Sequence, residues 1–320
     1  MIHVGPHVGN RYWACDVGDH QYYHNVSPSS GPWLNLLAWS DGLIDAGISR
    51  IPPQDNQNLL RPRYFGTVDM HLQLLRAARL LLKRMSEDQR VRADATPVLF
   101  HPDLHKRNIL VSENDPTVVT SILDWQSTSV EPAFWFATTT PDFADIHDRV
   151  ELLTDDGRTS KPHPGAGACA QAFDACLKFH LPILAKPRAL NEDLLRPFHY
   201  GYRSWKDGVV ALRHDLLMIS QNWKQLGFDE PCPVPVLEAK VILAHDKDYQ
   251  LFEAAQKLRR QVADYLNVSL EGWVPIDAWD RTQSQHRELF DGALQSISSA
   301  DENEPVKTEE DLRAIWPFDL

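Results

Sequence analysis

Apolar side chains recur at three- and four-residue spacing along much of this chain, which is typical of amphipathic helices. The clearest case runs from Val68 to Arg92, where one face carries Leu72, Leu75, Ala78, Leu82 and Met85. A shorter helix is predicted from Trp33 to about Gly47, and similar spacing continues through most of the stretch from about Gly165 to Ser299. The pattern predicts a mainly helical protein.

Between these helical stretches the period changes. Three short apolar runs are bounded by turn-forming residues, namely Val98–Phe100, Ile109–Val111 and Val118–Leu123. Such runs predict short strands. The last two flank the turn-rich segment Ser112–Thr117, so we expect them to pair as an antiparallel hairpin.

Composition divides the 320 residues into three parts. Residues 1–66 are predicted to be an irregular arm with one short helix, because Gly, Pro, Ser and His interrupt the pattern. Residues 67–300 form the predicted main body, and residues 301–320 an acidic tail, which is either solvated, the interpretation that we favour, or loosely docked. The arm contains irregularly spaced histidines, which favour scattered surface side chains over a metal site: His3, His7, His20 and His24.

Charge and cysteine content narrow the functional classes. The formal net charge of −12 argues against nucleic acid as a partner. Every long apolar stretch is cut by charged residues, so no membrane span is predicted. The four cysteines lack zinc-site spacing and disulfide density, and we interpret them as reduced thiols of an intracellular protein.

The segment from His101 to Asn108 carries the candidate chemistry. Asp103 and Asn108 are separated by four residues, which is the spacing of a carboxylate and a carboxamide in the kinase catalytic loop. A hairpin turn centred near Asp115 would place Asn108 roughly opposite Ile122, with Asp124 diagonally adjacent. Asn108 and Asp124 could then share a Mg²⁺ ion, which prefers hard oxygen ligands, and Asp103 could take the proton of an acceptor hydroxyl.

Two other interpretations of this segment remain open. It could be a polar turn and hairpin without chemistry. The pair His101 and His105 could also indicate a metallohydrolase, although that reading leaves Asn108 and Asp124 unexplained.

The run from Phe100 to Val111, followed by Leu123-Asp124-Trp125-Gln126, resembles the aminoglycoside phosphotransferase and choline kinase-like superfamily. With Val130–Trp135 it is similar to the fungal branch that includes the altered-inheritance-of-mitochondria proteins, in which Pro102 replaces the usual glycine. The resemblance implies an α+β fold, the mainly helical C-terminal lobe of a protein kinase-like fold. It also implies that Asp103 is the catalytic base and that Asn108 and Asp124 hold Mg²⁺ and, through it, ATP. His101 would shape the loop, and the role of His105 varies.

A complete kinase-like site also needs a Gly-rich loop over the phosphates and a strand lysine. No segment before residue 101 has the glycine spacing, and no lysine precedes Lys83. The resemblance implies that the chain starts at the hinge, without the N-terminal lobe. We therefore expect a phosphotransferase-family protein, using ATP and Mg²⁺ on a small-molecule hydroxyl, that is incompetent as this chain. The alternative is a non-catalytic kinase-like remnant that acts in binding or in mitochondrial inheritance. The expected location is the cytoplasm, and the resemblance implies that the mitochondrion is also possible.

Overall fold

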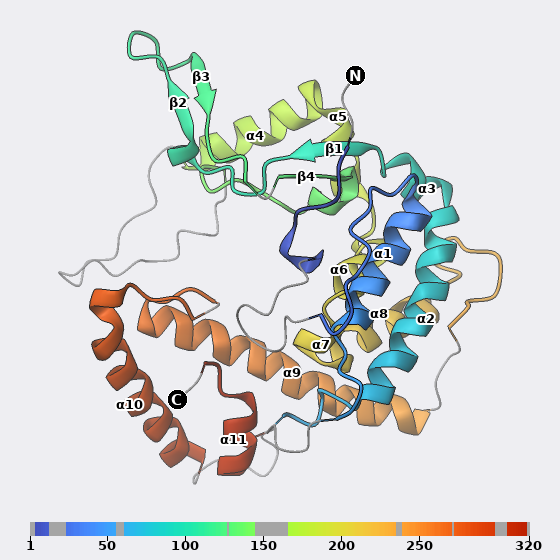
Figure 1. Ribbon diagram of the computed structural model, residues 1–320, viewed down its shortest axis with the longest axis vertical. Coiled ribbons are helices and arrows are strands. Elements are labelled where there is room, and N and C mark those ends of the chain that lie inside the picture. Colours follow the sequence, from blue (N-terminus) through green and yellow to red (C-terminus); the bar gives the residue numbers. More distant parts are fainter. Residues whose placement is uncertain are drawn as a thin grey trace.

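The computed structural model describes residues 4–12, 24–55, 61–126, 128–144, 166–234, 239–270, 272–297 and 306–318. They form helices and two small sheets, a mixed α+β fold in which both sheets lie in the upper part of the view and most helices lie below them (Figure 1). The helices are α1 (Leu36–Ser49), α2 (Val68–Glu87), α3 (Gln89–Ala93), α4 (Ala166–His180), α5 (Pro182–Ala185), α6 (Arg196–Tyr200), α7 (Ser204–Asp207), α8 (Val209–Asn222), α9 (Ala239–Leu266), α10 (Trp279–Ile297) and α11 (Glu309–Ile315). None of the described helices is long and apolar enough to cross a bilayer.

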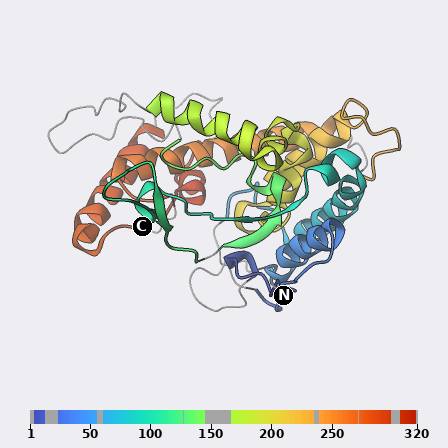
Figure 2. The same ribbon diagram turned by 90° about the horizontal axis from the view of Figure 1, so that it is seen from above.

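Helix α2 confirms the strongest hydrophobic pattern of the sequence. The side chain of Thr67 caps its first turn by accepting a hydrogen bond from the backbone N–H of Met70. Of the five side chains on the predicted face, four are fully buried and Leu72 is partly buried. This face packs on α1 and α8, and α1 and α2 lie side by side in both views (Figure 1, Figure 2).

The predicted helix from Val68 to Arg92 is two helices in the structure. Asp88 adopts an extended backbone after α2 and is the N-cap of α3. Its carboxylate accepts a hydrogen bond from the backbone N–H of Arg90 in the first turn of α3. A side chain that caps a new helix competes with continuation of the preceding helix. The apolar spacing continues from α2 into α3, so periodicity alone does not reveal the break at Asp88.

Four strands form two separate antiparallel sheets. Strand β1 (Pro97–Phe100) pairs with β4 (Ser129–Pro132), and β2 (Ile109–Val111) pairs with β3 (Val119–Ile122). The predicted hairpin is confirmed, but its register is shifted by one residue, because Ile109 faces Ile122. Strand β4 was not predicted. In Figure 1 the β2–β3 hairpin stands at the top of the molecule, well away from α10 and α11.

The C-terminal segment differs from the predicted solvated tail. Residues 309–315 form α11, which begins with a capping box between Thr308 and Asp311. Leu312, Ile315 and Trp316 are buried in small clusters shared with α9 and α10. Three apolar side chains at helical spacing are enough to dock a short segment whose average composition is acidic.

Candidate functional site

The predicted catalytic loop lies between β1 and β2 and is held by short-range hydrogen bonds. The backbone N–H of His105 donates to the carbonyl of Asp103, and that of Asn108 donates to the carbonyl of His105, both at 2.9 Å. The buried side chain of Asn108 donates from Nδ2 to the Asp103 carbonyl at 2.9 Å. The amide oxygen of Asn108 has no donor among the described residues and remains available as a ligand.

Asp124 lies next to Asn108 because the hairpin ladder extends past the strands. The backbone N–H of Leu123 donates to the carbonyl of Asn108 at 2.8 Å, so Asp124 directly follows the residue paired with Asn108. Asp124 has a φ of 63°, in the left-handed region that few non-glycine residues adopt. Strained backbone of this kind persists where the surroundings impose it, and it clusters at functional sites.

His101 connects the end of β1 to the turn at Asp124. Its ring is buried, and Nε2 donates to the carbonyl of Leu123 at 2.8 Å, so Nε2 carries a proton. The indole of Trp125 packs edge-on at a centroid distance of 5.0 Å. His101 therefore contacts the turn that precedes Asp124, through the carbonyl of Leu123.

His105 lies between two carboxylates. Its Nε2 is 2.5 Å from Oδ1 of Asp103, and its Nδ1 is 3.5 Å from Oδ2 of Asp142. The other oxygen of Asp142 accepts a hydrogen bond from the backbone N–H of Lys106 at 3.1 Å. Asp142 therefore braces the loop from outside it, and no sequence motif pointed to it. The side chain of Asp103 is 46% exposed, so the carboxylate remains accessible to a ligand.

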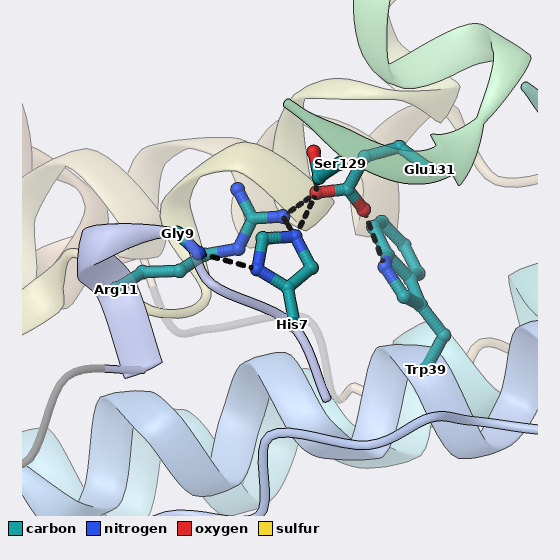
Figure 3. Close-up of polar contacts among 6 residues, drawn as sticks. All are labelled: His7, Gly9, Arg11, Trp39, Ser129 and Glu131. Atoms are coloured by element: carbon teal, nitrogen blue, oxygen red, sulfur yellow. Dashed lines mark hydrogen bonds and ion pairs between the residues drawn. The ribbon is translucent and has the colours of Figure 1, made fainter. Parts of the chain in front are cut away.

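A second polar cluster surrounds Glu131 on β4 (Figure 3). Its carboxylate is 1% exposed and accepts hydrogen bonds from Trp39 Nε1 at 2.8 Å and from Ser129 Oγ at 3.3 Å. Arg11 forms an ion pair with it, and Nε2 of His7 lies 2.6 Å away. The cluster fastens residues 4–12 to β4, and a carboxylate satisfied by this many donors is structural.

His7 corrects one prediction, because its side chain is buried and not scattered on the surface. Burial, together with the Arg11 guanidinium, lowers the pKa of His7 to about 4, so the ring is neutral at pH 7. Nδ1 accepts a hydrogen bond from the backbone N–H of Gly9 at 2.9 Å, and Nε2–H therefore donates to Glu131. The sequence did offer a signal, since an acidic residue within the apolar run Val130–Trp135 needs a polar partner when buried.

The donor atoms near the hairpin fit magnesium better than a softer metal. Within the described ranges, no three His, Cys, Asp or Glu side chains gather in an arrangement that could hold a metal by themselves. The amide oxygen of Asn108, just before β2, and the carboxylate of Asp124, just after β3, are hard ligands on neighbouring segments of the hairpin base. Mg²⁺ is commonly bound by one or two such groups plus substrate phosphates and water, so this pair is suited to it.

Comparison with known proteins points to the same segment. Residues 47–136 match the model of the phosphotransferase enzyme family. Two subtelomeric hrmA-associated cluster proteins, from two strains of Aspergillus fumigatus, are each 26% identical to this chain over 250 residues, covering 68% of the chain and 46% of the relative. The chain thus spans about half the length of these curated relatives, and no solved structure matches it. The matched segment contains Asp103, Asn108 and Asp124, so the candidate site lies within the part of the chain that is similar to the phosphotransferase enzyme family.

Proposed function

We propose that this chain carries the catalytic loop and metal-binding turn of a phosphotransferase that uses ATP and Mg²⁺ on a small-molecule hydroxyl. The observation that carries the proposal is the hairpin bond between Leu123 N–H and the Asn108 carbonyl, which brings Asn108 beside Asp124. The family match over residues 47–136 supports the reaction class. In this proposal residues 67–300 correspond to the helical lobe of a kinase-like fold.

Each residue of the site has a distinct role in this proposal. Asn108 and Asp124 hold Mg²⁺, which neutralises the negative charge of the nucleotide phosphates when it is bound. Asp103 accepts the proton of the acceptor hydroxyl, and His105 holds Oδ1 of Asp103 at 2.5 Å and so orients the carboxylate. His101 keeps the Asp124 turn in place through the Leu123 carbonyl.

The site is proposed to bind ATP weakly in this chain alone. The first lysine of the sequence, Lys83, lies on helix α2, and no strand in the described part of the chain carries a lysine. Without a strand lysine and a Gly-rich loop, the α and β phosphates have few partners besides the metal. Contacts with Mg²⁺ would then contribute most of the binding free energy for ATP, and phosphoryl transfer by this chain would be slow.

A non-catalytic kinase-like binding protein, including one that acts in mitochondrial inheritance, is the second candidate. It is favoured by the lack of a lysine on the described strands, together with the 2.5 Å contact between Asp103 Oδ1 and His105 Nε2, which engages one oxygen of the proposed base in the resting protein. The two candidates differ in whether Mg²⁺ and ATP bind at Asp124.

Thermal unfolding with and without Mg²⁺ and ATP separates them. We expect Mg²⁺ with ATP to raise the Tm of the wild-type chain, and we expect Asp124→Asn to abolish the rise because a metal ligand is lost. Asp103→Asn should keep the rise, because Asp103 is assigned to the proton and not to the metal. Glu113→Gln, which removes an exposed carboxylate from the same hairpin, is the matched control.

No rise in the wild-type Tm at millimolar Mg²⁺ and ATP would support the non-catalytic candidate. An equal rise in Asp124→Asn would show that nucleotide binds somewhere other than this hairpin.

A further inference from the structure

A cavity of about 430 Å³ lies between α9 and the end of α6 with α7, outside the hairpin site. Tyr200, Arg203 and Asp207 line it from the α6–α7 side. A single stripe of α9 lines the other side, because Tyr249, Phe252, Gln256 and Arg260 are spaced by three and four residues. Its volume is within the range of small-molecule sites.

The cavity is lined by more cationic side chains than carboxylates. Arg203 forms an ion pair with Asp207 at 2.8 Å, and this contact occupies the Asp207 carboxylate. Lys257 and Arg260, one helical turn apart on α9, form no ion pair with another described residue. Only Glu253 on the same stripe opposes them, so three cations face two carboxylates in a protein whose net charge is −12. The excess positive charge is local and favours an anion.

The aromatic wall of the cavity is held rigid. The ring of Tyr249 stacks on His214 at a centroid distance of 3.7 Å and an interplanar angle of 7°. The ring of Phe252 packs edge-on against Tyr64 at 5.6 Å and is buried. These fixed rings form a small apolar wall, and the exposed cationic side chains form a charged rim.

We propose that this cavity binds a small organic anion, a molecule with a ring or other flat apolar portion and one carboxylate or phosphate. The flat portion lies against Tyr249 and Phe252, and the anionic group meets Lys257 and Arg260. The lining disfavours polyamines and other multiply charged cations. This binding does not require Mg²⁺, ATP or Asp103, so it can be tested independently of the phosphotransferase proposal.

Three ring compounds of similar size test the charge preference. Benzoate, phenyl phosphate and benzylamine are titrated into the full chain without nucleotide, and binding is followed by ligand-observed NMR. We expect at least one of the two anions to bind and benzylamine not to bind. Comparison of benzoate with phenyl phosphate shows which anionic group the rim prefers. Because Lys257 and Arg260 are exposed, we also expect affinity to fall as the salt concentration rises.

Variants on α9 locate the site. The double variant Lys257→Gln with Arg260→Gln should raise the Kd of the bound anion on the order of tenfold, through loss of charge-assisted contacts. Lys247→Gln, an exposed position on the same helix outside the cavity lining, should leave the Kd unchanged. The proposal is overturned if neither anion binds at low millimolar concentration, if benzylamine binds equally well, or if the double variant and Lys247→Gln behave alike.

Discussion

Two carboxylates near the small sheets, Asp103 and Glu131, have opposite surroundings. The side chain of Asp103 is 46% exposed and has one side-chain partner, His105, whereas that of Glu131 is 1% exposed and is surrounded by His7, Arg11, Trp39 and Ser129. A catalytic carboxylate needs free lone pairs and access to substrate, and a structural one needs every lone pair satisfied. The Asp103 carboxylate meets the requirement of access to a ligand, whereas the Glu131 carboxylate is satisfied by protein donors and contributes to stability.

The largest expected effect is on stability, at Glu131. Glu131→Ala leaves the guanidinium of Arg11 buried without its ion pair and should lower the free energy of unfolding by about 3–5 kcal/mol. Urea unfolding followed by tryptophan fluorescence measures it. Replacing both members of the pair with leucine should recover part of the loss, because no uncompensated charge then remains buried.

The carboxylate of Asp103, on the loop before the hairpin, is the control for this experiment. Asp103→Asn should change the free energy of unfolding by less than about 1 kcal/mol, since Asp103 makes its ion pair in solvent. Equal losses for Glu131→Ala and Asp103→Asn would remove the distinction between a structural and a ligand-binding carboxylate.

The next effect is a loss of stability in mild acid. Burial, with a smaller contribution from Arg61, lowers the pKa of His71 to about 3, and the pKa of His7 is lowered to about 4. Both groups stay neutral in the folded chain while the unfolded chain takes up protons below pH 6.5. Their contribution to stability is therefore complete above pH 6.5 and is lost as the pH falls toward 4 and then 3.

His71 provides the cleaner measurement, because its side chain is completely buried between Phe65 and Trp205 and neither ring nitrogen has a partner. As the pH falls from 6 to 4, protonation of His71 in the unfolded chain should reduce the free energy of unfolding by about 1.4 kcal/mol per pH unit. Urea unfolding at a series of pH values should show a shallower slope for His71→Phe. An unchanged slope would mean that His71 does not stay neutral in the fold.

The sequence predicted those features that depend on neighbours along the chain. The buried face of α2 and the β2–β3 hairpin follow from periodicity and turn residues, and the hairpin was enough to place Asn108 near Asp124. The one-residue register shift arises because hairpin register depends on turn geometry and on the irregularity between Leu110 and Val111, which the apolar pattern does not specify.

Features that join distant segments were not predictable in this way. Strand β4 pairs with a strand about thirty residues earlier, and His7 meets Glu131 across 124 positions. Neither contact is associated with a periodic pattern of apolar residues in the sequence. The partners of Glu131 were therefore not predictable from periodicity, although an acidic residue within an apolar run indicated that partners were needed. The candidate site lies within residues 101–126, where neighbouring residues along the chain carry the pattern.

The smallest effect concerns the strained backbone at Asp124. Glycine adopts a φ of 63° without the steric cost that a side chain brings, so Asp124→Gly should raise the free energy of unfolding, by up to about 1 kcal/mol. The same change should abolish any Tm rise produced by Mg²⁺ with ATP, because the carboxylate is gone. A gain in stability together with a loss of binding, measured by urea unfolding and thermal shift on one variant, would show that the fold tolerates strain here for the sake of the ligand. A variant that is less stable than wild type would instead assign the Asp124 carboxylate a structural role like that of Glu131.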